Sequence, residues 1–224
     1  MTARILSIDT TGEFGSVALL EGERVVEEVL LHAPEGFGHI LFEQIKRLLA
    51  RHGWEVGGID CFAGAAGPGS FTGIRVGLAA VKGLAEATGR QAVAVSNLQA
   101  LALFGTAPLR ATVLDARRGE VYGAVYDAAL EIVRPESVGK FAAWLETLPR
   151  EGIEFVATDF GPFRVAVQGT AFEGTPVMEV PRAIAGAVGV IAARRLAAGR
   201  AGDPAGIDAN YVRRSDAELL WKDR

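Results

Sequence analysis

Small residues and a proline stand together in GPGSFTG, residues 67–73, directly before a helix-like run. The spacing of its three glycines is one residue longer than the dinucleotide fingerprint, and no Lys-Ser/Thr pair follows as in a P-loop. A G-x-S-x-G nucleophile turn would need glycine in place of Pro68 and Thr72. The pattern therefore favours a sharp turn in which Ser70 caps the next helix, and the helix N-terminus would attract an anion.

Two aspartates end strand-like runs and precede turns. Asp9 closes RILSID and is followed by Thr10 and Thr11, and Asp115 has the same place in RATVLDA. Such turns can hold phosphate oxygens or a hydrated magnesium ion, or can be Asx turns that only close a hairpin. Ligand sites in open α/β sheets lie at strand carboxyl ends, so these four residues and Ser70 are the candidate anion or nucleotide contacts.

Arg117 and Arg118 follow Asp115 directly and are possible partners for the same anion. The three histidines, in contrast, stand at positions 32, 39 and 52, without i, i+4 spacing or a carboxylate-rich cluster around them. We therefore predict no zinc or iron site and assign no catalytic residue. Cys61 is the single cysteine, so an internal disulfide is excluded.

The composition favours a well-packed protein of one large domain or two lobes. The chain has 224 residues, half of them hydrophobic, and a net charge of −4. Proteins that grip nucleic acid alone are usually strongly basic, so a nucleic-acid role would need a partner. The N-terminal sequence runs straight into a strand pattern and does not resemble a signal peptide, and no stretch reads as a membrane span. A cytoplasmic protein is the expectation.

The order of strand-like and helix-like runs repeats after Pro108, which predicts two α/β lobes, residues 1–107 and 108–224. Each lobe would contain hairpin strands, a helix, a further strand and another helix. The expected strands are residues 4–9, 16–22, 24–31, 59–65, 91–96, 110–116, 120–127, 131–135 and 154–159. The expected helices are residues 39–53, 70–87, 97–105, 140–148 and 182–199.

Two helices of the first lobe have unusual faces. Residues at i, i+4, i+7 and i+11 of the helix after the glycine turn form a nearly smooth stripe, and the helix from His39 has a broad apolar face. These faces would pack on the lobe's own sheet or against a helix of another chain. The candidate interface residues are Ile40, Leu41, Ile45, Leu48, Gly73, Gly77, Ala80 and Leu84.

Several motifs together resemble the TsaB family, also called YeaZ. They are ILSIDTTGEFGSVALL, HILFEQIKRLL, GAAGPGSFTGIRVGLAAVKGLA, AVSNLQALA, LDARRGEVYGAVYD and the closing NYVRR, and they run in order through nearly the whole chain. The resemblance implies the duplicated two-lobe actin-like fold (ASKHA, ribonuclease H-like). It also implies a role in making N6-threonylcarbamoyladenosine on tRNA.

The same resemblance implies a non-catalytic subunit that supports the related transferase TsaD through its first-lobe helices. TsaD holds a metal through an H-x-x-x-H pair, and the matching positions here are Asn97 and Leu101, of which leucine cannot bind a metal. TsaE, an ATPase, would join the pair, and tRNA would be met only through the complex. The isolated chain could form a homodimer.

No cofactor is expected to bind tightly, and ATP, ADP or magnesium would bind only at the level of the complex. The alternative is a stand-alone actin-like ATPase or phosphotransferase that uses Asp9 and Asp115. The absence of a clear glycine-rich adenosine turn in RAIAGAVGVIAARR argues against this alternative.

Overall fold

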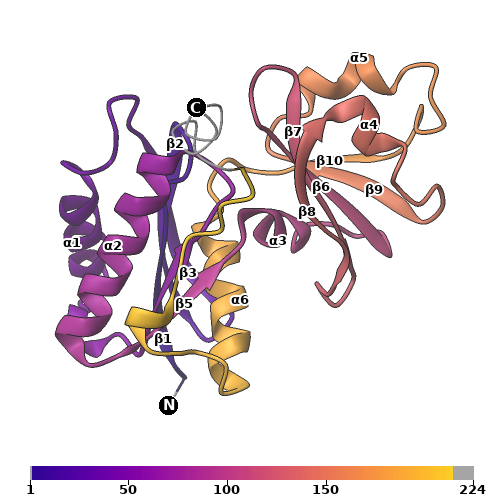
Figure 1. The fold of residues 1–224 in the computed structure, drawn as a ribbon. Helices are drawn as coiled ribbons and strands as arrows, with labels where there is room; N and C mark the ends of the chain where they lie inside the picture. Colours follow the sequence, from indigo (N-terminus) through magenta and orange to yellow (C-terminus); the bar gives the residue numbers. More distant parts are fainter. Residues whose placement is uncertain (1, 214–224) are drawn as a thin grey trace, which may run out of the picture. The chain divides into compact units, whose positions relative to one another are not determined.

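The computed structural model describes residues 2–213 and forms two compact units (Figure 1). Unit 1 contains the described residues up to Asn97 and then residues 182–210. Unit 2 contains Leu98–Pro181 and the described residues from Tyr211 onward. This division differs from the expected lobes 1–107 and 108–224, because the chain returns to unit 1 near its end. Residues 214–224 of the expected second lobe lie outside the described part.

Unit 1 is built on a five-stranded sheet in the order β3-β2-β1-β4-β5. Its first three strands form antiparallel pairs, and β4 and β5 add in parallel. The strands are β1 (Arg4–Asp9), β2 (Phe14–Glu21), β3 (Arg24–His32), β4 (Cys61–Ala65) and β5 (Gln91–Val95). The helices are α1 (Leu41–Arg51), α2 (Phe71–Thr88) and α6 (Ala185–Ala197), with 3-10 turns at Val56–Gly58 and Pro204–Gly206.

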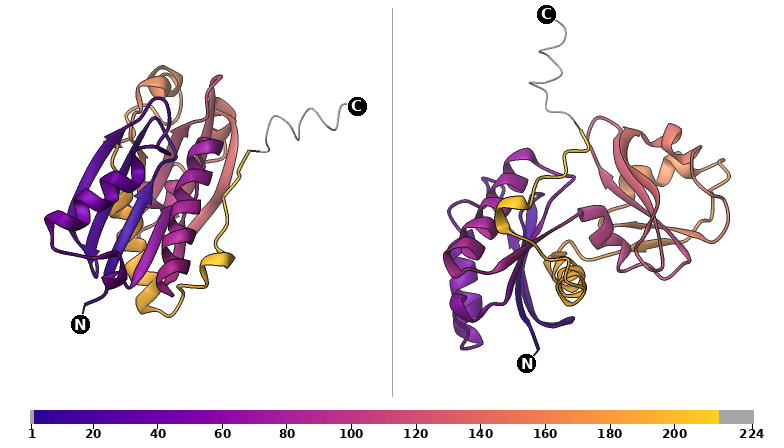
Figure 2. Two further views of the ribbon diagram at one scale, coloured as in Figure 1. Left: turned by 90° about the vertical axis from the view of Figure 1, so that its left-hand side faces the viewer. Right: turned by 60° about the horizontal axis from the view of Figure 1, so that its bottom comes forward.

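Helices cover both faces of this sheet, α1 and α2 on one side and α6 on the other (Figures 1 and 2). The central strands are buried on both faces, which explains their nearly unbroken apolar sequences. Ser70 caps α2 as expected, since its hydroxyl accepts the N–H of Gly73 at 3.3 Å. Gly89 ends α2 in a left-handed conformation, with φ of 63°.

The helix α6 belongs to unit 1 because its buried small residues let it lie close to β1 and β2. A Cβ at Gly189 would be 2.2 Å from Leu20 Cδ1, so a larger residue here would force the Leu20 side chain to move. The hydroxyl of Ser16 on β2 accepts the N–H groups of Ile184 and Ala185 at the start of the helix, at 3.1 and 2.9 Å. A carboxylate oxygen of Glu28 accepts the next N–H, that of Gly186, at 2.9 Å.

Unit 2 repeats the strand topology of unit 1. Its sheet has the order β10-β9-β6-β7-β8, which is the order of unit 1 once each strand number is raised by five and the direction of reading is reversed. The strands are β6 (Leu109–Asp115), β7 (Glu120–Asp127), β8 (Ile132–Lys140), β9 (Ile153–Ala157) and β10 (Val177–Glu179). The helices are α3 (Asn97–Ala102), whose first residue belongs to unit 1, α4 (Phe141–Leu145) and α5 (Arg164–Val167), with a 3-10 turn at Gly161–Phe163.

The repeated topology confirms the predicted duplicated α/β fold, with a separate core in each unit. The core of unit 2 is rich in aromatic rings that pack in tilted and edge-to-face pairs, among them Phe141, Phe155 and Phe160. Most elements were predicted within two or three residues, except that β8 continues to Lys140 and that α5 and β10 were not expected. Both missed elements are too short to show a periodic pattern.

Candidate functional site

The aspartate turn after β1 is closed by its own neighbours. One carboxylate oxygen of Asp9 accepts the backbone N–H of Thr11 at 2.9 Å and its hydroxyl at 2.6 Å. The amide of Asn97 in turn donates to the Thr11 hydroxyl at 2.6 Å and accepts the N–H of Gly67 at 2.8 Å. This chain of bonds, within unit 1, joins the β1–β2 turn to the glycine-rich loop and to Asn97.

Burial governs the ionisation of Asp9. The loss of solvent raises the pKa of Asp9 above its ordinary value of 3.8, more than the hydrogen bonds from Thr11 and Asn97 lower it. Glu28 adds a smaller like-charge contribution in the same direction. A buried carboxyl that resists ionisation and is already hydrogen-bonded is poorly suited to hold a hydrated cation.

The hydroxyl of Thr10 is also used inside the unit. It donates to the carbonyl oxygen of Gly73 in the first turn of α2, at 2.7 Å. A Cβ at Gly73 would meet the Thr10 carbonyl oxygen at 2.0 Å, and one at Gly77 would meet the Thr10 hydroxyl at 2.5 Å. The glycines of α2 therefore allow this helix to touch the backbone of the β1–β2 turn.

The two positions that the resemblance matches to TsaD's metal-binding histidines do not fit a metal. The side chain of Asn97 is buried and engaged by Thr11 and Gly67, and Leu101 is fully buried and apolar. Among the described residues, no group of three or more His, Cys, Asp or Glu could hold a metal ion. Burial raises the pKa of the Cys61 thiol to about 12, so this cysteine is held as a neutral core residue.

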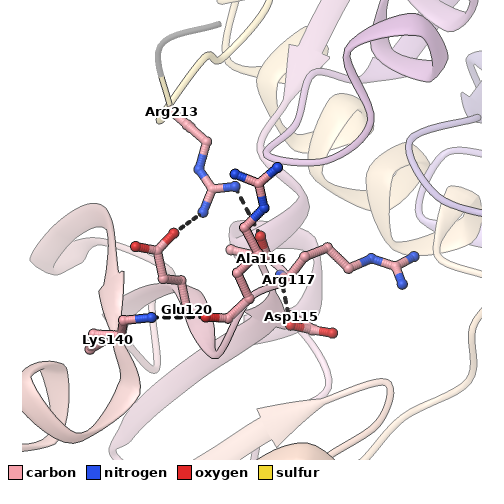
Figure 3. A network of polar contacts seen from close by, with 7 residues as sticks. Asp115, Ala116, Arg117, Glu120, Lys140 and Arg213 are labelled. Carbon is pink, nitrogen blue, oxygen red and sulfur yellow. Dashed lines mark hydrogen bonds and ion pairs between the residues drawn. The ribbon is translucent and has the colours of Figure 1, made fainter. Parts of the chain in front are cut away.

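The corresponding turn in unit 2, after β6, is exposed. Asp115 accepts the backbone N–H of Arg117 at 2.8 Å, which makes it an Asx turn of the kind that closes a hairpin (Figure 3). Lys140 donates to the carbonyl oxygen of Arg118 in the middle of the turn, and Arg213 donates to that of Ala116 at its start. Of the five candidate anion contacts, Asp9, Thr10 and Thr11 thus lie together in unit 1 near the cap residue Ser70, whereas Asp115 lies in unit 2.

Three of the four candidate interface residues on the first helix are buried in the core of their own unit. Leu41, Ile45 and Leu48 are each exposed by 2% or less, and Ile40 before the helix is half-buried. The apolar face that they form packs on the sheet, so these side chains offer almost no exposed area to a partner.

The candidate residues on α2 divide in the same way. Gly77 and Ala80 are buried, and Gly73 lies against Thr10, so the simpler interpretation, packing within the lobe, holds for these three. Leu84 is half-buried and lines a groove on the outside of the unit. The sequence pattern identified the small-residue helix correctly but assigned its inner side to a partner.

The surface of α1 and α2 has features that the pattern did not single out. Phe42 is 56% exposed and lies at a groove of about 340 Å³ between α1, the following turn and α2. Apolar side chains form most of its wall, with Lys46 and Glu55 as polar members. The apolar lining residues are Phe42, Ile45, Leu49, Ala50, Trp54, Val56 and Leu84.

Beside this groove, the outer side of α2 is smooth. Thr72, Ala79, Gly83 and Ala87 are exposed and Val76 is half-buried, and their spacing places them along one side of the helix. A Cβ at Gly83 would meet nothing within 4 Å, so no contact with residues 2–213 requires a glycine there. We call this stripe together with Phe42 and its groove the outer helical face. The large apolar residues Ile74, Leu78 and Val81 mark the core side of α2, and their spacing was the sequence signal that could have separated the two stripes.

The comparisons with known proteins agree with the motifs. Residues 33–186, more than half of the chain, match the model of the family described as "TsaD: tRNA N6-adenosine threonylcarbamoyltransferase".

Within residues 2–213, none of the helices has the length and hydropathy of a membrane span.

Several of the similar proteins carry TsaB or YeaZ names. The chain is 29% identical to the tRNA threonylcarbamoyladenosine biosynthesis protein TsaB of Bacillus subtilis, over 97% of both chains. It is 32% identical to TsaB of Haemophilus influenzae, over 75% of this chain and 73% of that protein. A Pseudomonas aeruginosa structure described as similar to peptidase YeaZ superposes with a TM-score of 0.79, at 26% identity, covering 94% of this chain and all of that one. The chain belongs to the TsaB (YeaZ) family of proteins of tRNA threonylcarbamoyladenosine biosynthesis.

Proposed function

We propose that this chain is a non-catalytic subunit that supports a TsaD-type transferase, and that it binds this partner through the outer helical face. The proposal rests on the exposed Phe42, which lies at an apolar groove. Next to it, one side of α2 carries small residues, and at Gly83 no contact with the described residues requires a glycine. A glycine in a helix interior costs about 1 kcal/mol relative to alanine, so Gly83 is explained by close approach of another backbone.

A helical partner suits both parts of this surface. Small residues let two helices approach closely, and an apolar side chain from the partner would fill the groove beside Phe42. The match of this chain to the TsaD family model supports a partner of related architecture. A second copy of this chain would offer the same surface, so a homodimer in isolation is part of the proposal.

We propose that the chain is non-catalytic because neighbouring residues already occupy the hydrogen-bonding groups of the candidate polar residues. Asp9, Thr10 and Thr11 are engaged by neighbours, and the bonds of Asn97 connect the same turn to the glycine loop. A phosphate at this turn would have to displace these buried bonds, each worth about 1 kcal/mol or more. This supports the expectation that nucleotide and magnesium bind only in the complex of this chain with TsaD, which TsaE would join.

The interface is tested by Phe42→Glu and Gly83→Leu, with Val165→Glu as the matched control, since Val165 is 76% exposed on unit 2. Burial of a phenylalanine side chain contributes about 1.5–3 kcal/mol, so Phe42→Glu should weaken the measured affinity for the TsaD partner by at least about tenfold. Isothermal titration calorimetry gives the affinity, and urea unfolding verifies that the variants fold. Equal affinity for Phe42→Glu and Val165→Glu would contradict the interface.

The supporting role is tested by reconstituting tRNA modification with and without this chain. We expect modification to require both the chain and its partner, and we expect the chain alone to show no ATP turnover. ATP turnover by the pure chain that is lost in Asp9→Ala would instead establish the ATPase alternative.

A further inference from the structure

The turn between β6 and β7 holds two arginines in an unusual backbone conformation. Arg117 and Arg118 have φ of 67° and 56°, and Gly119 follows with φ of 70°. Residues with a side chain rarely adopt this left-handed region, and two in succession are rarer still. Backbone strain of this kind persists where the surroundings impose it and is concentrated at functional positions. We call residues 115–120 the arginine turn.

The surroundings do impose this conformation. Asp115 accepts the N–H of Arg117 at 2.8 Å, and Lys140 Nζ donates to the carbonyl oxygen of Arg118 at 2.8 Å. Arg213 donates to the carbonyl oxygen of Ala116 at 3.0 Å and pairs with Glu120. Figure 3 shows Lys140 and Arg213 reaching the turn from different sides. The backbone that carries the two arginines is therefore held at both ends and in the middle.

The charges of this region are not balanced. Glu120 is occupied by Arg213, and Asp115 by the backbone of the turn, while Arg117 and Arg118 are exposed. Within the part of the chain that the structure describes, neither of these arginines forms an ion pair. A local excess of cations thus stands on a chain whose net charge is −4.

We propose that the arginine turn binds the phosphodiester backbone of RNA, and this inference rests on the proposed function in tRNA modification. Two guanidinium groups on a rigid support can each make bidentate contacts to phosphate oxygens, at a lower entropic cost than mobile lysines. The turn closes the β6–β7 hairpin, and Arg117, Arg118 and Gly119 at its tip are exposed. An extended polyanion can reach two guanidinium groups on such an exposed tip, whereas a small nucleotide needs a concave site.

The experiment measures the affinity of the complex of this chain with its TsaD partner for labelled tRNA, at salt concentrations between about 50 and 200 mM. The test variant is Arg117→Gln/Arg118→Gln. The matched control is Arg134→Gln/Arg150→Gln, which removes the same charge from exposed positions of the same unit. We expect the test variant to weaken tRNA binding about tenfold and to lower the salt dependence by one to two ion equivalents, with little change in the control.

A second pair of variants separates charge from folding. Arg117→Gly/Arg118→Gly removes the charge and also relieves the left-handed strain, so its melting temperature should be no lower than that of the natural chain while tRNA binding falls. Arg117→Lys/Arg118→Lys keeps the charge and should retain most of the salt dependence.

Failure of the inference and failure of the proposed function give different results. If both double variants, to Gln and to Gly, leave tRNA affinity and its salt dependence as in the control, the RNA contact is overturned even though the complex forms. If they instead weaken association with TsaD or TsaE by size-exclusion chromatography, the turn is a protein contact and the inference is also overturned. If the unaltered chain does not associate with TsaD, the proposed function is wrong, and the RNA contact that rests on it is overturned as well.

Discussion

Asp9 illustrates how a residue that has the right chemistry for a phosphate site can serve the fold instead. Its carboxylate, the Thr11 hydroxyl and the Asn97 amide form a buried chain in which each group has a partner. Buried polar groups that are fully satisfied specify one arrangement of the backbone around them. In unit 1 that arrangement brings together the β1–β2 turn, the glycine loop and Asn97.

The raised pKa of Asp9 predicts a pH dependence of stability. Because the pKa is higher in the folded chain than the ordinary value of 3.8, the folded state binds the proton more tightly. The protonated form of Asp9 therefore stabilises the fold fully at pH values below about 3.8. This stabilisation is lost as the pH rises through the raised pKa of the folded chain. Asp9→Asn keeps the acceptor oxygen for Thr11 and removes the titration.

We expect Asp9→Asn to gain stability relative to the natural chain as pH rises above about 4, by up to about 1.4 kcal/mol per pH unit. Urea unfolding of both proteins across a pH series measures this difference. Parallel curves for the two proteins would show that Asp9 ionises in the folded chain as easily as in the unfolded one.

At the scale of elements, α2 has two sides with different reasons for small residues. Its inner side needs Gly73 and Gly77 because Thr10 lies within 2.0–2.5 Å of the positions that a Cβ would take. Its outer side includes Gly83, where a Cβ would have open space. The inner stripe is therefore part of folding, and only the outer one is available for association.

The two sides predict opposite effects of the same substitution. Gly77→Leu should lower the free energy of unfolding by about 1–3 kcal/mol or more, because the side chain would be forced against Thr10. Gly83→Leu should leave it unchanged or raise it by up to about 1 kcal/mol, since leucine is the better helix former. Urea unfolding of both variants compares them, and a loss of similar size in each would mean that α2 does not have this orientation.

At the scale of the whole molecule, the chain closes unit 1 with a helix that comes near its end. Ser16 bonds residues 184 and 185 at the start of α6, across sequence separations of 168 and 169. The order of elements along the chain therefore does not correspond to two consecutive lobes. Unit 1 cannot complete its second layer until α6 is in place.

Ser16→Ala tests this closure. The substitution removes the acceptor of two N–H groups in a fully buried place, so we expect a loss of about 1–3 kcal/mol in the free energy of unfolding. Ser137→Ala, at an exposed position of β8, is the control and should change it by less than about 0.5 kcal/mol. Equal unfolding curves for the two variants would show that the cap of α6 does not contribute to stability.

The sequence alone determined most of the strands and helices, though not α5 and β10, and also the repetition of their order, the cap at Ser70 and the family. These properties follow from local periodicity, turn residues and motifs, which are encoded in neighbouring positions. Only the tertiary structure decided which side of α2 faces Thr10, whether Asp9 and its neighbours have free oxygens, and to which unit α6 belongs. The physical reason is that periodicity shows which side of a helix is apolar or small but does not show what that side packs against. In addition, hydrogen bonds such as those from Asn97 to Thr11 and from Ala185 to Ser16 join residues that are far apart in the chain.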